Sequence, residues 1–241
     1  NGVATYRNKG FFGQVDGLNF ALQYQGNNES AGAGEGTGNG ENRKLSRENG
    51  DGFGLSTSYD FDFGLSLGAA YSSSDRSNNQ VAKGFQDGMN KRNSYAGGET
   101  ADAWTVGAKY DAYNVYLAAM YSETRNMTSY GSGSYKNAAG VDVAKGGIAN
   151  KTQNFEAVAQ YQFDFGLRPS IGYSYSKALD VAGYKDSDRL NYIEIGTWYY
   201  FNKNMNVYTA YQINLLDKSD YVLAHGLNTD DQLAFGIVYQ F

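Results

Sequence analysis

Apolar and polar residues alternate without a break over the last eleven residues of the chain, 231–241. The large apolar side chains of this segment share one side: Leu233, Phe235, Ile237, Tyr239 and Phe241. Small or polar residues occupy the other side. A period of two predicts a β-strand with two unlike faces, one apolar and aromatic, the other small or polar.

The same alternation recurs along the rest of the chain. We expect eleven strands, at residues 2–12, 18–25, 53–60, 65–72, 105–110, 115–122, 155–164, 167–176, 192–201, 206–215 and 231–241. Segments of about ten residues match the length of a tilted membrane strand. Alternation alone also fits the sheet of a soluble protein, so the lengths of the connections are needed to distinguish it from a membrane barrel.

Short and long connections alternate between these segments. Asp, Asn and Gly mark tight turns near residues 16–17, 62–64, 111–113, 164–166 and 202–204. Long polar stretches fill 26–50, 74–101, 125–150, 178–189 and 217–230. All short turns therefore lie on one rim and all long loops on the other. This asymmetry is typical of an outer-membrane barrel, so the predicted fold class is all-β, a transmembrane antiparallel β-barrel.

The two faces of such a barrel have different surroundings. On the apolar face we expect contact with lipid at Leu117, Ala119, Ile195, Ile213, Leu233, Phe235, Ile237, Tyr239 and Phe241. Aromatic rings near the strand ends of that face predict two interfacial girdles. On the polar face we expect pore-lining residues at Arg7, Asp60, Lys109, Tyr116, Glu156, Gln160, Gln162, Asp164, Arg168, Glu194 and Gln212.

Composition limits the kinds of functional site that the chain can contain. Cys is absent and the only histidine is His225, which excludes Cys-based metal sites and predicts no metal centre, catalytic cluster or cofactor. The glycine run 32–40 lacks a full dinucleotide fingerprint, and the pairs Asp217/Asp220 and Asp230/Asp231 are interpreted as solvated loop charge. A net charge of −5 argues against a nucleic-acid partner.

The chain resembles the enterobacterial general porins of the OmpC, OmpF and PhoE type. The resemblance covers every predicted strand and departs only in the long loops. Its most specific segments are 15–24, 49–52, 109–111, 116–119, 154–170, 199–205 and the closing Gly-Ile-Val-Tyr-Gln-Phe at 236–241.

The resemblance implies a homotrimer of sixteen-stranded barrels in the bacterial outer membrane. Each barrel would be a passive, water-filled pore for small hydrophilic solutes and ions, in contact with lipid and lipopolysaccharide. Residues 1–241 look like a single porin domain that lacks the first five strands and the constriction loop. The family's constriction residues therefore cannot be assigned to any position here.

Three other functions stay open. A substrate-specific channel would use lumenal aromatics, for which Tyr116, Tyr192, Trp198, Tyr200 and Tyr208 are the candidates. A soluble β-sheet adhesin or binding protein fits the alternation but not the segregated loops. An outer-membrane enzyme would need a nucleophile beside a histidine, and no such motif surrounds His225, so we expect no enzymatic activity.

Overall fold

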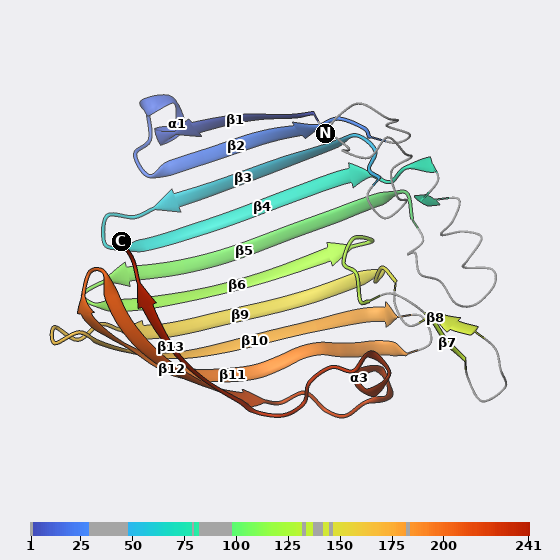
Figure 1. Cartoon of the computed structure of the whole chain (residues 1–241). Coiled ribbons are helices and arrows are strands. Elements are labelled where there is room, and N and C mark those ends of the chain that lie inside the picture. The colour runs from blue at the N-terminus through green and yellow to red at the C-terminus, as the bar shows by residue number, and fades with distance from the viewer. Residues whose placement is uncertain are drawn as a thin grey trace.

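The computed structural model describes residues 2–28, 48–78, 80–81, 98–131, 134–136, 142–144, 147–181 and 184–241. In these residues eleven strands form one antiparallel sheet, and each strand pairs with its neighbours in chain order (Figure 1). The strands are β1 (Val3–Lys9), β2 (Leu18–Gln25), β3 (Gly52–Asp60), β4 (Leu65–Asp75), β5 (Thr100–Ala112), β6 (Val115–Arg125), β9 (Lys151–Tyr161), β10 (Leu167–Val181), β11 (Lys185–Asn202), β12 (Met205–Asn214) and β13 (Gln232–Tyr239).

Outside this sheet, the helices and strands of the described residues are short. A single helical turn, α1 (Gly10–Gly13), follows β1. A hairpin of β7 (Ser134–Lys136) and β8 (Asp142–Ala144) stands in the loop between β6 and β9, and α3 (Asp220–His225) lies between β12 and β13. Figure 1 shows this hairpin and α3 at the same end of the sheet, the end that carries the long loops. Among the described residues, no helix combines the length and apolar character that crossing a membrane requires.

Left-handed backbone conformations make the short turns. Tyr113 and Asn114 have φ of 54° and 66°, as a two-residue turn between β5 and β6 requires. Gly166 has φ of 97°, and a Cβ there would lie 2.5 Å from the carbonyl oxygen of Tyr200. Only glycine fits such a position, and it lets the backbone turn tightly beside the β11 strand.

The structure confirms an all-β antiparallel sheet but moves several expected boundaries. The first segment ends at Lys9, because residues 10–13 leave the extended conformation at Phe11 and Phe12, whose φ values are positive. The expected long loop at 178–189 is wrong. Residues 167–181 and 185–202 are strands there, since pairing continues through two register shifts after Ser176 despite the polar sequence.

Neither end of the sheet is closed. β1 pairs only with β2, and β13 pairs only with β12, within the described residues. Within the described residues, β13 therefore has one edge without a neighbouring strand. A free strand edge exposes a row of unpaired backbone N–H and C=O groups.

The described buried apolar side chains form one small cluster at α3, the adjoining loop ends and the end of β10. The described buried apolar residues lie around α3 and the adjoining loop ends: Tyr130, Ala149, Ala178, Val181, Leu216, Tyr221 and Val222. Most large apolar side chains of the strands are instead exposed on one face. A sheet whose apolar face lacks a covering layer needs another apolar medium or partner.

Candidate functional site

The register aligns the polar side chains across neighbouring strands. Lys109 of β5 lies opposite Ser66 of β4 and Ala118 of β6. Glu194 of β11 lies opposite Gly172 of β10 and Gln212 of β12. The pleat then carries the small and polar residues to one face of the sheet, as alternation predicts. We call this surface the polar face.

The opposite, apolar face is open to its surroundings. Leu117 is 45% exposed, Ile195 50%, Ile237 66% and Phe235 74%. Ala119, Leu233, Tyr239 and Phe241 are also exposed, whereas Ile213 is half-buried. Such a band of exposed aliphatic and aromatic side chains across a sheet is what the lipid-facing surface of a membrane barrel presents.

Arg168 is the best-organised cation of the polar face. Its Nη2 donates a hydrogen bond to Oε1 of Gln160 at 2.6 Å, and its guanidinium carbon lies 6.0 Å from the ring centroid of Tyr116. Trp198 stands opposite Arg168 on β11. In the described part of the chain Arg168 forms no salt bridge, so its charge is held by an amide and a ring instead of being neutralised.

Two acidic residues of the polar face flank β10. Glu156 of β9 lies opposite Ser174, and Glu194 of β11 lies opposite Gly172. Within the described residues neither carboxylate takes part in a salt bridge. Fixed, unpaired charges of this kind face water at little cost and influence which ions pass nearby.

Other predicted pore-lining residues lie nearer the short-turn end. Arg7 is exposed on β1, opposite Ala21. Asp60 ends β3, where Nδ2 of Asn19 donates to its Oδ2 at 3.2 Å. The strand expected at 155–164 already ends at Tyr161, so Gln162 and Asp164 belong to the turn and its edge. The early end follows from the turn bond between the Phe163 N–H and the Leu167 carbonyl, 2.8 Å.

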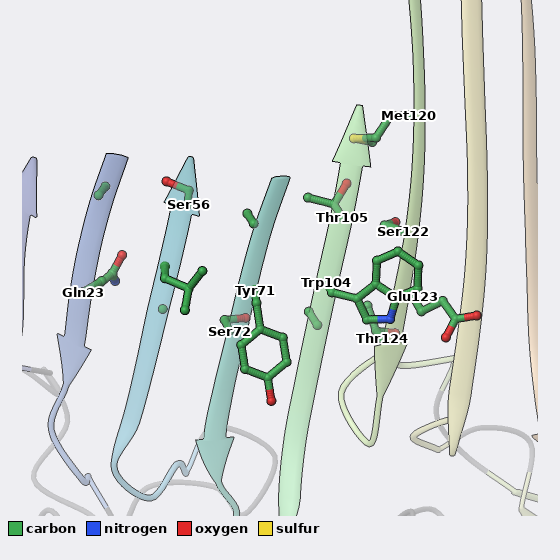
Figure 2. A pocket seen from close by; sticks show the side chains of 15 residues that line it. Gln23, Ser56, Tyr71, Ser72, Trp104, Thr105, Met120, Ser122, Glu123 and Thr124 are labelled. Atoms are coloured by element: carbon green, nitrogen blue, oxygen red, sulfur yellow. The ribbon is translucent and has the colours of Figure 1, made fainter. Parts of the chain in front are cut away.

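The first of several depressions lies over β2 to β6 and has a volume of about 470 Å³. Figure 2 shows its labelled side chains on neighbouring strands, half of them small and hydroxyl-bearing: Ser56, Ser72, Thr105, Ser122 and Thr124. It contains one acidic residue, Glu123, and no histidine. These lining residues offer no nucleophile–base pair for catalysis.

Tyrosines at the long-loop end of the apolar face donate hydrogen bonds to carboxylates. These carboxylate partners were not predicted from the sequence, because four of the five carboxylates come from a neighbouring strand or its end. The pairs are Tyr24–Asp51 (2.8 Å), Tyr71–Asp102 (3.1 Å), Tyr121–Glu123 (2.7 Å), Tyr175–Asp188 (2.8 Å) and Tyr211–Asp231 (2.6 Å). Only Glu123 is two residues from its tyrosine in sequence. We call this set the tyrosine–carboxylate belt.

Aromatic pairs mark the opposite end of the apolar face. Tyr and Phe two residues apart meet edge to face, because alternate residues of a strand share a side. The pairs are Tyr59–Phe61 (centroids 4.6 Å apart), Tyr161–Phe163 (4.8 Å) and Tyr199–Phe201 (5.0 Å). We call this set the aromatic-pair rim. The two sets together give the two girdles expected from the sequence.

His225 belongs to a packed aromatic cluster at α3. Its Nδ1 lies 2.7 Å from the Tyr221 carbonyl oxygen, and its ring centroid is 4.2 Å from that of Tyr221. Burial raises the pKa of Tyr221, an effect that Arg189 partly offsets. No cluster of three His, Cys, Asp or Glu suited to a metal occurs among the described residues. The glycine run 32–40 lies outside them.

The acidic pairs Asp217/Asp220 and Asp230/Asp231 of the last loop differ in their surroundings. Asp217 is exposed, and Asp220 begins α3, where it favours the helix N-terminus. Asp230 and Asp231 precede β13. The pKa of Asp231 is lowered because the Tyr211 hydroxyl and the Asn214 backbone N–H donate to its carboxylate.

Comparison with known proteins agrees with this architecture. The family model of the Gram-negative porins matches residues 1–241. Outer membrane protein S1 of Salmonella typhi is 69% identical, and outer membrane porin N of Escherichia coli K12 is 55% identical, each over 100% of this chain. The chain spans 62% and 61% of these relatives, respectively.

A solved structure supports the same assignment. Salmonella typhi OmpF in complex with daunomycin is 47% identical, with a TM-score of 0.76 over 100% of this chain and 62% of that chain. A strand order, an exposed apolar face and two girdles define a segment of an outer-membrane β-barrel. The chain belongs to the Gram-negative porin family and to the bacterial outer membrane, as the resemblance to general porins predicted.

Proposed function

We propose that this chain forms part of the wall of a water-filled outer-membrane channel through which small hydrophilic solutes and ions diffuse passively. The main support is the contrast between the two faces of one sheet. The apolar face exposes aliphatic side chains between two girdles. The polar face carries charges that form no salt bridge within the described residues, such as Arg168, Glu156 and Glu194. The channel works without a catalytic group or cofactor.

The remaining assignments follow from that proposal. The pore-lining residues of the wall are Arg7, Asp60, Lys109, Tyr116, Glu156, Gln160, Arg168, Glu194 and Gln212, with Gln162 and Asp164 at the short-turn mouth. The partners are lipid, lipopolysaccharide and two further copies in a trimer. Closure of the barrel requires further strands, because β1 and β13 do not pair and eleven strands cannot close an antiparallel sheet.

Ion selectivity tests the channel. Arg168→Glu, in the protein as the cell inserts it in the outer membrane, should shift the reversal potential in a salt gradient toward cation selectivity, because fixed wall charge enriches counter-ions within roughly 8 Å at physiological salt. Ile195→Thr, a neutral change on the apolar face, is the control. An unchanged reversal potential in Arg168→Glu would contradict a charged, lumenal Arg168.

A second experiment tests closure. Residues 1–241 expressed alone and refolded in detergent should give neither heat-resistant trimers nor steady single-channel conductance. Stable, conducting trimers from these residues would contradict the requirement for further strands and would indicate a smaller barrel.

A substrate-specific channel remains the second candidate. Its specific support is the Trp198–Tyr208 pair, whose ring centroids lie 6.4 Å apart on the polar face. Among the described residues, however, no contact extends this pair to Tyr116, Tyr192 or Tyr200 as a continuous track. A maltooligosaccharide that slowed ion flow at low concentration would favour this candidate over a general channel.

A further inference from the structure

A second depression lies on the polar face of β6, β9, β10 and β11, and its volume is about 400 Å³. Tyr116 and Tyr192 stand at its two ends. Val158 and Gly172 contribute to its floor, and Glu156 and Glu194 are its charged lining residues. A concave surface with apolar walls and a few polar groups is the usual form of a small-molecule site.

The floor leaves room between the two carboxylates. Glu156 and Glu194 are carried by β9 and β11, on either side of β10. The positions of β10 between them are Gly172, which has no side chain, and Ser174, whose side chain is small. Because neither carboxylate forms a salt bridge in the described residues, both can accept from a bound cation.

The Tyr116 end of the depression has the opposite charge. The guanidinium of Arg168 lies over the Tyr116 ring, 6.0 Å from its centroid, and Gln160 holds one of its nitrogens. The other guanidinium N–H groups stay available, since Arg168 has no carboxylate partner in this part of the chain. Arg168 and Gly172 are four residues apart on β10, which corresponds to about 13 Å along the strand.

We propose that this depression binds short zwitterionic peptides that carry an aromatic side chain. The ammonium group lies between Glu156 and Glu194, the carboxylate meets Arg168, and the aromatic ring packs on Tyr116. The charges of an extended tripeptide are about 10 Å apart, which fits the spacing once the arginine and glutamate side chains reach inward. A solute with only one charge would leave either Arg168 or the two glutamates without an oppositely charged group, or would be repelled by them.

The proposal rests on the proposed channel and is tested in the same membranes. The probes are Gly-Gly-Phe with free ends, its C-terminal amide and its N-acetyl form. We expect saturable interruptions of the ion current by the zwitterion. Amidation or acetylation should each weaken the apparent affinity about fivefold, as exposed ion pairs lead one to expect.

Matched variants assign each end. Arg168→Gln should weaken the zwitterion about fivefold and leave the amide unchanged, because the amide lacks the group that Arg168 binds. The double variant Glu156→Gln/Glu194→Gln should weaken the zwitterion and leave the N-acetyl form unchanged. Arg7→Gln removes one positive charge and Asp60→Asn one negative charge from the same face at β1 and β3, outside the depression, and neither should alter peptide affinity.

The outcomes separate the two proposals. Normal conductance with equal affinities for the three probes would overturn the peptide site and leave the channel intact. If the unmodified protein did not conduct, the proposed channel would be wrong. The peptide site would then be tested in detergent by titrating the fluorescence of Trp198 with the peptide, in a Trp104→Phe variant. Peptide affinity that falls equally in Arg7→Gln and Arg168→Gln would also overturn the peptide site, since the effect would then come from the overall charge of the polar face and not from a specific contact.

Discussion

The two rims of the apolar face anchor the same residue type in two ways. At the long-loop end, Tyr24, Tyr121 and Tyr211 each donate a hydrogen bond to a carboxylate. At the short-turn end, Tyr161 and Tyr199 instead contact a phenylalanine edge to face. A tyrosine at an interface has an apolar ring and a polar hydroxyl, and either part can be fixed by its neighbours.

The difference follows from what each rim is connected to. Long polar loops supply acidic residues at the strand ends, as Asp51 and Asp231 do just before β3 and β13. The short turns supply phenylalanine in the repeated sequence Phe-Asp-Phe-Gly at 61–64 and 163–166. The belt therefore adds negative charge at the long-loop interface, whereas the other rim relies on ring contacts alone.

The largest expected effect lies between the two rims. Leu117→Arg on the apolar face should destabilise the inserted protein by roughly 2–4 kcal/mol, because the charge would sit near the bilayer midplane. Unfolding by guanidinium in lipid vesicles measures it. Ala118→Arg, one residue away on the polar face, is the control. Equal costs at the two positions would contradict the assignment of faces.

Glu123 is the most buried carboxylate of the belt. It accepts from Tyr121 at 2.7 Å and from Gln153 at 2.8 Å, and it lies 2.8 Å from Nζ of Lys151. Glu123→Ala should cost roughly 1–3 kcal/mol, since it leaves these donors without an acceptor. Adding Lys151→Met should recover part of the loss. A double variant as unstable as the single one would contradict the coupling.

The aromatic-pair rim should give a smaller loss. Phe163→Leu keeps an apolar side chain but removes the edge-to-face contact with Tyr161, and we expect a cost of about 0.5–1.5 kcal/mol. The matched change at the other rim is Tyr24→Phe, which removes only an exposed hydrogen bond. Thermal unfolding of both variants compares the rims. A larger effect of Tyr24→Phe would reverse their order.

The smallest effect concerns pH. The folded pKa of Asp231 is lowered by its bonds from Tyr211 and Asn214, so the deprotonated form is favoured by folding. This stabilisation is present above the unfolded pKa of about 3.9 and is lost as pH falls through the folded pKa. Asp231→Asn should therefore flatten the pH dependence of unfolding below about pH 4. An unchanged acid slope would show that Asp231 does not contribute.

Local pattern alone determined the strands. The period of two depends on neighbouring residues, so Leu18–Gln25 was predicted to the residue, and the eleven strands expected correspond to the eleven strands of the main sheet. The alternation of short and long connections can also be read from the sequence directly, and it distinguished the short-turn end of the sheet from the long-loop end. The pattern failed at 178–189, where β10 and β11 stay paired through two register shifts, because hydrogen bonds to a neighbouring strand do not require a strict alternation of side chains.

Only the tertiary structure decided which side chains meet. Tyr175 finds Asp188 and Arg168 finds both Gln160 and Tyr116, although these partners lie on other strands. Strand register sets such contacts, and register depends on the whole sheet. The sequence by itself thus determined the alternation, the two faces and the family. The belt, the contacts of Arg168 and the depression beside it exist because separate strands bring distant residues together.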